Sequence, residues 1–286
     1  MVFLIRTIAS IALLALAAAC AHQAPSPTQQ ATLLADKGRY EEASRVLRAH
    51  LVEHPDAVAE RRLLIRLLAA QGQMDAARAE VEMLRKLLGP GDPRPWLELG
   101  HAFELTHDYE QALSMYDQAA DTAPRDPAGP LTGGLRAARW GEVELARPRL
   151  EEALRRDPSN ASAWHALGLV CLHLEDFTAA QVAYDSGLHA DPQSIENRIG
   201  LASLALTRGH MEEALRQYDA ILKDRPKFGD AHLGRSFALM KLGRYAEARD
   251  TLETGYRLGA NPAVVSRQRA LLDRLSATSP SRASTE

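Results

Sequence analysis

The apolar residues of this chain recur with a helical period, and one pattern of small and large residues returns seven times along it. An alanine marks each return, and consecutive alanines lie 34 residues apart except for a single gap of 35. Apolar residues at spacings of three and four surround each alanine, which is typical of amphipathic helices. A period of this length predicts an array of helical hairpins. The markers are Ala43, Ala77, Ala112, Ala146, Ala180, Ala214 and Ala248.

The third unit shows the pattern most completely. Trp96, Gly100 and Phe103 fall on one face of a first helix, and Ala112 and Tyr116 fall on one stripe of a second. The small residues allow the two helices to cross closely, and the aromatic residues fill the space beside the crossing. A proline follows the second helix in this and most later units, because its ring cannot continue the hydrogen-bond ladder.

These residues at this spacing resemble the tetratricopeptide repeat. The resemblance implies an all-α fold, a right-handed α-solenoid of about seven helix-turn-helix repeats. Residues 31–88 hold degenerate N-terminal units, residues 93–262 hold a regular array, and residues 263–275 form an amphipathic helix expected to cap the open end. The glycines and prolines of the run from Gly89 to Pro93, where one residue is inserted, predict a hinge or a local irregularity.

The N-terminus has the layout of an export segment. One cation, Arg6, precedes an uncharged apolar stretch over residues 8–16, and three alanines stand directly before Cys20. This arrangement resembles the signal peptide of bacterial lipoproteins, which implies that residues 1–19 are removed and that Cys20 carries lipid. An ordinary cleaved signal and an uncleaved membrane anchor are the alternatives.

The residues that flank the repeats lack apolar periodicity. Residues 20–30 are uncharged and contain two prolines, which predicts a flexible tether, and residues 276–286 are mostly Ser, Thr, Ala and Pro, which predicts a disordered tail. Ala21 follows the cysteine, and in the resembled lipoproteins this favours the outer membrane. The expected location is therefore the periplasmic face of a bacterial outer membrane, reached through a lipid anchor.

Composition changes this picture little. Hydrophobic residues make up 46% of the 286 residues, charged residues 25% and aromatic residues 5%, as expected for a chain that is helical nearly throughout. The formal net charge is -3 and no segment gathers lysine and arginine, so no nucleic-acid partner is expected.

Candidate chemistry is sparse. Cys171 stands where the third unit has phenylalanine, which predicts a buried inert thiol. Gly133 and Gly134 lack the lysine and hydroxyl residue of a phosphate-binding loop. His165 and His173 lie on one helix without a third ligand at metal-binding spacing. The sequence therefore predicts no catalytic residue, no metal site and no cofactor, and the protein is not expected to be an enzyme.

The resemblance to tetratricopeptide repeats also implies a concave surface, lined by positions one, five, eight and nine after the tryptophan landmark of each first helix. These positions are mostly apolar and lack the lysines and asparagines with which co-chaperone repeats hold a terminal carboxylate. An apolar helix or extended segment of a partner protein is therefore expected there, although some of the leucines are expected to pack between repeats. The expected groove residues are Leu97, His101, Leu131, Leu135, Arg139, His165, Leu169, His173, Ile199, Leu206, Leu233, Phe237 and Met240.

The stretch from Ala163 to Leu206 resembles the lipoproteins of tight-adherence (Flp/Tad) pilus assembly. The resemblance implies a membrane-attached factor that helps to assemble a pilus or secretion apparatus, with the secretin or its neighbours as partners. Two rivals have the same architecture: a pilotin-like lipoprotein of type IV pili, and a scaffold for a cell-wall or exopolysaccharide enzyme.

Overall fold

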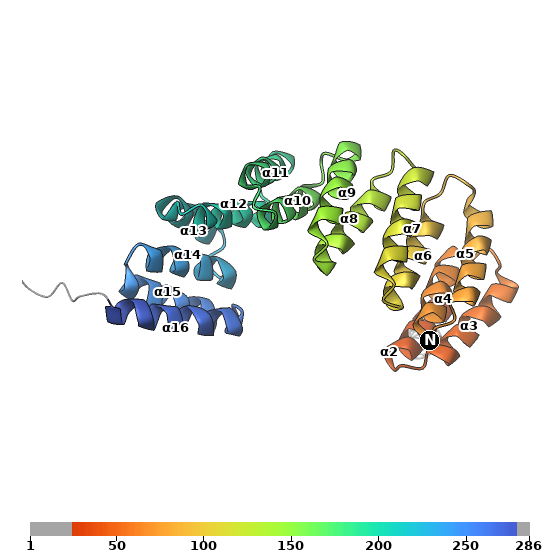
Figure 1. Ribbon diagram of the computed structural model, residues 1–286. Coiled ribbons are helices and arrows are strands. Elements are labelled where there is room, and N and C mark those ends of the chain that lie inside the picture. The colour runs from red at the N-terminus through yellow and green to blue at the C-terminus, as the bar shows by residue number, and fades with distance from the viewer. Residues whose placement is uncertain (1–24, 279–286) are drawn as a thin grey trace, which may run out of the picture. The chain divides into compact units, whose positions relative to one another are not determined.

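The computed structural model describes residues 25–278, and all regular structure in that range is helical. Seven consecutive helix pairs, one for each repeat, are followed by a single last helix (Figure 1), which confirms the all-α solenoid. No helix in the described range is both long and apolar enough to cross a membrane. The helices are α2 Pro27–Asp36, α3 Tyr40–Glu53, α4 Val58–Ala70, α5 Met74–Leu88, α6 Arg94–Leu105, α7 Tyr109–Thr122, α8 Ala128–Trp140, α9 Val143–Arg156, α10 Ala161–His173, α11 Phe177–Ala190, α12 Ile195–Thr207, α13 Met211–Asp224, α14 Gly229–Lys241, α15 Tyr245–Arg257 and α16 Pro262–Thr278.

The chain divides into two compact units, Met1–Ala123 and Pro124–Glu286. Helices α2 to α7 belong to the first unit and helices α8 to α16 to the second. The expected hinge at Gly89–Pro93 does not coincide with this division, because α6 packs against both α4 and α5 across that loop. The expected export segment of residues 1–19 and the expected lipidation site Cys20 lie outside the described residues.

In the pairs α6–α7, α8–α9 and α10–α11, a large residue of the second helix is seated on a glycine of the first. The ring of Tyr184 on α11 lies so close to α10 that a Cβ added to Gly168 would be 2.3 Å from its Cε1 atom. Gly100 and Tyr116 are related in the same way in the α6–α7 pair, with a corresponding distance of 2.4 Å. Glycine is therefore required at these crossings by the space available.

A buried ion cluster joins α4 to α6 in the first unit. The carboxylate of Glu98 is fully buried and accepts hydrogen bonds of 2.7 Å and 2.8 Å from Nε and Nη2 of Arg66, and one of 2.7 Å from Nε of Arg62. Burial alone would raise the pKa of Glu98, but the two guanidinium groups outweigh it and hold that pKa below its ordinary value. This cluster spans the loop at Gly89–Pro93 and ties its two sides together.

Both ends of the array are helical further than the sequence predicts. Helix α2 begins at Pro27, inside the expected tether of residues 20–30, because Ser26 and Gln29 form a capping box. Helix α16 runs to Thr278, past the predicted end of the cap at residue 275 and into the expected tail of residues 276–286. It packs on α14 and α15, the last helix pair.

Candidate functional site

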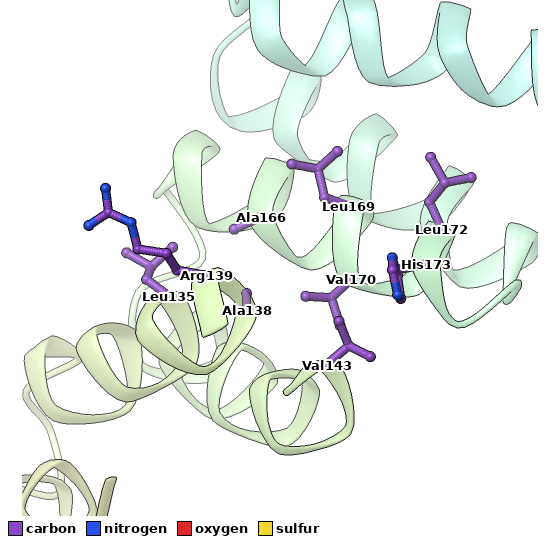
Figure 2. A pocket seen from close by; sticks show the side chains of 9 residues that line it. All are labelled: Leu135, Ala138, Arg139, Val143, Ala166, Leu169, Val170, Leu172 and His173. Atoms are coloured by element: carbon purple, nitrogen blue, oxygen red, sulfur yellow. The ribbon is translucent and has the colours of Figure 1, made fainter. Parts of the chain in front are cut away.

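An open apolar pocket of about 650 Å³ lies in the second unit between α8 and α10 (Figure 2). Its volume falls within the range of about 300–1,000 Å³ that is typical of ligand pockets. Both helices are the first helices of their pairs, the positions at which the groove is expected. The lining residues are Leu135, Ala138, Arg139, Val143, Ala166, Leu169, Val170, Leu172 and His173.

The repeat register places the leucines of this pocket. Leu135 and Ala138 stand on α8 where Leu169 and Leu172 stand on α10, exactly one period of 34 residues later. Because the two helices repeat the same orientation, these side chains converge on one surface (Figure 2). Leu135 is 42% exposed and Leu169 is 48% exposed, so both remain open to solvent despite their apolar chemistry.

The ends of the pocket carry its only ionisable side chains. Figure 2 shows Arg139 at one end, beside Leu135, and His173 at the other end, near Leu172 and Val143. Both are exposed, and no aspartate or glutamate lines this pocket. The structure thus brings together four of the groove residues expected from the sequence, namely Leu135, Arg139, Leu169 and His173.

Tyr184 lies on α11, and its ring packs against Gly168 of α10. Its hydroxyl is buried and has no hydrogen-bond partner. Its counterparts in other repeats are satisfied: the Tyr116 hydroxyl donates to Oε1 of Glu104 at 2.6 Å, and the Tyr218 hydroxyl lies 3.1 Å from Oγ of Ser203. In the register of Tyr184, the position of Glu104 is held by Leu172 and the position of Ser203 is held by Leu169.

A second buried polar atom lies close to this tyrosine. The ring of His165 is 5.9 Å from the ring of Tyr184, and its Nδ1 atom is buried without a partner. Burial lowers the pKa of His165, although Glu196 on the next repeat acts in the opposite direction. Burial thus favours the neutral form of His165. The residue is half-buried and does not line the pocket.

The last repeat does not offer the groove surface that the sequence predicts. Leu233 is 6% exposed and Met240 is 1% exposed, so the expectation that both face a partner is wrong. The last helix is the reason, because Val265 of α16 lies in one buried cluster with Leu233 and Leu272 of α16 lies in another with Met240. The remaining expected residues are half-buried; they are Leu97, His101, Leu131, Ile199, Leu206 and Phe237.

Three lining residues, Val143, Ala166 and Val170, stand at none of the four predicted concave positions. Val143 is the first residue of α9 and enters the pocket from the second helix of the pair, a direction that a rule based on first helices omits. Ala166 and Val170 lie on the side of α10 that turns toward the preceding pair, and their i, i+4 spacing is the sequence feature that could have identified them.

Candidate chemistry is weak elsewhere in the described range. No group of three His, Cys, Asp or Glu side chains is placed to hold a metal ion between residues 25 and 278. Cys171 is a free, buried cysteine, and burial raises the pKa of its thiol, which disfavours the reactive thiolate. Gly134 faces Leu150, with 2.8 Å between an added Cβ and Cγ of that leucine, so close helix packing accounts for it.

Comparison with solved structures shows the same architecture. A tetratricopeptide repeat protein from Parabacteroides merdae ATCC 43184 is 18% identical with a TM-score of 0.61, over 88% of this chain and 86% of its own. YrrB, a tetratricopeptide repeat protein with an unusual peptide-binding site, is 18% identical with a TM-score of 0.53, over 66% of this chain and 97% of its own. Identities this low show the fold alone.

Curated relatives match through their repeats. The heat-shock protein cognate co-chaperone sgt12 of Aspergillus fumigatus is 32% identical over 120 residues, which are 41% of this chain and 34% of its own length. The chain spans about a third or less of such relatives. The tetratricopeptide repeat family itself matches residues 28–93, 96–130, 131–195 and 199–262. This chain therefore belongs to the tetratricopeptide repeat family.

Proposed function

We propose that this chain is a non-catalytic scaffold that holds a partner protein by an apolar segment seated between α8 and α10. Tetratricopeptide repeats generally mediate protein–protein interaction, and their proteins are mostly scaffolds. The peptide-binding site of YrrB supports a peptide ligand on this fold. The observation that carries the proposal is the unpartnered hydroxyl of Tyr184 beside the apolar pocket.

The unpartnered hydroxyl indicates that the residues lining the pocket are not those that would make the fold most stable. A buried polar group without a hydrogen bond costs about 1–3 kcal/mol. A glutamate at the position of Glu104, or a serine at the position of Ser203, would supply the missing partner and remove this cost. Leu169 and Leu172 occupy those two positions and instead present apolar surface to the pocket. Stability that is forgone beside an exposed apolar patch is typical of a binding site.

A glutamate in place of Leu172 is expected to stabilise the fold while abolishing binding. The new carboxylate would accept a hydrogen bond from Tyr184, as Glu104 does from Tyr116, and a net gain of about 1 kcal/mol is expected in the free energy of unfolding. Binding is expected to fall at least tenfold, because a carboxylate would be desolvated against an apolar partner segment. Urea denaturation, together with the binding of phage-displayed peptides selected on the wild-type chain, measures both effects.

Leu206 supplies the matched control. It holds the same register position in the next repeat, where the hydroxyl of Tyr218 already has Ser203, and it packs against the core there. Leu206→Glu is therefore expected to lose stability and to keep the selected peptides. The role of Leu172 would be refuted if Leu172→Glu destabilised the fold as much as Leu206→Glu, or if it retained its peptides at full affinity.

We also propose that the protein is attached by lipid to the periplasmic face of a bacterial outer membrane. The export segment before Cys20 supports this location. Cys20→Ser is expected to shift the protein from the membrane fraction to the soluble fraction, because acyl chains contribute about 0.8 kcal/mol for each buried methylene. Fractionation after a high-salt wash measures the shift. A mutant that stays with the membranes would contradict lipidation at this residue.

The assembly served by the scaffold is proposed to be a tight-adherence pilus or a related secretion apparatus, with its secretin or assembly components as partners. The resemblance of Ala163 to Leu206 supports this choice. A photo-crosslinking amino acid at Leu169, which is 48% exposed in the pocket, would trap the partner in intact cells for mass spectrometry. A pilus secretin supports the proposal. A polysaccharide synthase or a cell-wall hydrolase would favour the alternative scaffold.

A further inference from the structure

We propose that the partner segment carries a carboxylate next to its apolar side chains, and that Arg139 binds this carboxylate at the end of the pocket. The inference rests on the proposed function, because it specifies the chemistry of a segment that the pocket is proposed to hold. It follows from the unpaired side chain of Arg139, from the absence of acidic residues in the pocket lining, and from the apolar positions that repeat from α8 to α10.

Arg139 makes no hydrogen bond and no ion pair through its side chain, although it lies in the last turn of α8 and is exposed. Arginines on the neighbouring α9 are engaged: Arg147 contacts Glu151 and Asp176, and Arg156 contacts Glu152. The position near the C-terminus of α8 stabilises the positive charge of Arg139, but the N–H groups of its guanidinium still have no hydrogen-bond acceptor. Arg139 thus presents a free cation beside Leu135 (Figure 2).

The chemistry of the pocket selects for an anion. A guanidinium offers five N–H donors in a planar fork that matches a carboxylate, and its charge cannot be removed by deprotonation. No acidic side chain lines this pocket, whose other ionisable residue is His173. The adjoining surface is apolar, and an ion pair at the edge of a surface that excludes water is stronger than one in open solvent. A cationic partner residue would meet repulsion at the same place.

The occupant is a linear protein segment and not a compact small molecule. The apolar positions repeat from one first helix to the next, since Leu135 on α8 corresponds to Leu169 on α10 and Ala138 corresponds to Leu172, one period later. A surface that repeats from helix to helix fits a chain that runs across the helices. We therefore assign to the partner an acidic residue directly beside two or more large apolar residues, placed so that its carboxylate reaches Arg139.

A random library of 12-residue peptides displayed on phage tests this assignment. Selection is performed in parallel on the wild-type protein, on Arg139→Glu, and on the matched charge variant Arg48→Glu. Arg48 is exposed on α3 in the other unit. A fourth selection uses Leu135→Glu combined with Leu169→Glu, which removes the apolar floor of the pocket. Both leucines are exposed, so this double variant is expected to keep its helicity and its melting temperature.

Wild-type and Arg48→Glu proteins are expected to select apolar peptides that contain Asp or Glu, whereas Arg139→Glu is expected to select the same apolar residues with Lys or Arg. For one selected peptide, changing its acidic residue to the amide should weaken binding to the wild-type protein about fivefold and leave binding to Arg139→Ala unchanged. This double-mutant cycle isolates the pair. The cycle is read by fluorescence anisotropy at two salt concentrations, because salt should weaken only the intact pair.

The possible failures are distinguishable. Apolar peptides without acidic enrichment, or with the same enrichment on Arg139→Glu, would overturn the carboxylate assignment and leave the apolar pocket standing. Peptides that bind the Leu135→Glu, Leu169→Glu double variant as well as the wild type would overturn the pocket itself, and with it the proposed function.

Discussion

Replacement of Gly168 by valine is expected to lower the free energy of unfolding by about 3 kcal/mol or more. A Cβ at this position would lie 2.3 Å from Cε1 of Tyr184, well inside van der Waals contact. The ring has little room to move, because its Cε1 atom would also lie 2.3 Å from a Cβ added at Gly200 on α12. Overpacking of a tight core typically costs about 1–3 kcal/mol, and here two helices would have to separate.

The measurement is thermal unfolding followed by circular dichroism, with an expected fall of roughly 10 °C in Tm. Gly91→Val is the matched control, since an added Cβ at Gly91 meets nothing within 4 Å and the residue lies in a loop. Tyr184→Ala should offset part of the loss in a double mutant, because the clash requires the ring. An unchanged Tm for Gly168→Val would show that the crossing of α10 and α11 is not tightly packed.

Glu98→Gln is expected to destabilise the first unit by about 2 kcal/mol at neutral pH. The substitution keeps the shape of the side chain but leaves Arg62 and Arg66 facing each other without their shared counter-ion. Removal of one partner from a fully buried pair typically costs about 3–5 kcal/mol. A smaller cost is expected here because the two arginine side chains are 38% and 43% exposed, so water screens their repulsion.

The pH dependence of this difference gives the sharper test. The folded-state pKa of Glu98 is lower than its ordinary value of 4.5, so its contribution to stability is fully present above that value. The contribution is lost as the pH falls through the folded-state pKa. Urea denaturation at a series of pH values should therefore show a constant gap between wild type and Glu98→Gln down to about pH 5, and a shrinking gap in more acidic solution. A gap that persists unchanged at pH 3 would exclude ionised Glu98 as its source.

The repeat architecture could be predicted from the sequence because its determinants are local. The spacing of Gly100, Ala112 and Tyr116 encodes one helix crossing, and each later unit has a small residue, an alanine and a large residue at the same positions of the 34-residue period. The register also predicted that Leu135 and Leu169 lie on one surface, and both line the same pocket in the structure. Whether those residues bind a partner stays a prediction.

Features that depend on contacts between distant segments could not be predicted in this way. The sequence places Leu233 and Met240 on a groove, yet α16 folds back over α14 and buries both. The glycines and prolines of Gly89–Pro93 predict a loose junction, but Glu98 joins α4 to α6 across it. The repeat pattern describes packing within one unit and between neighbouring units. The burial of Leu233 and Met240 by α16 and the ion cluster of Glu98 do not recur with the 34-residue period.

The seat of Tyr184 between Gly168 and Gly200 has a mechanical consequence. The ring belongs to α11 but fills a gap shared by α10 of its own repeat and α12 of the next. Any strain that spreads these two helices must pull an aromatic ring out of a close-fitting site, whereas the α8–α9 crossing is filled by the more flexible aliphatic side chain of Leu150 against Gly134. When a partner loads the second unit, the Tyr184 junction should therefore act as a stiff element, and elastic compliance should be greater toward α8 and α9.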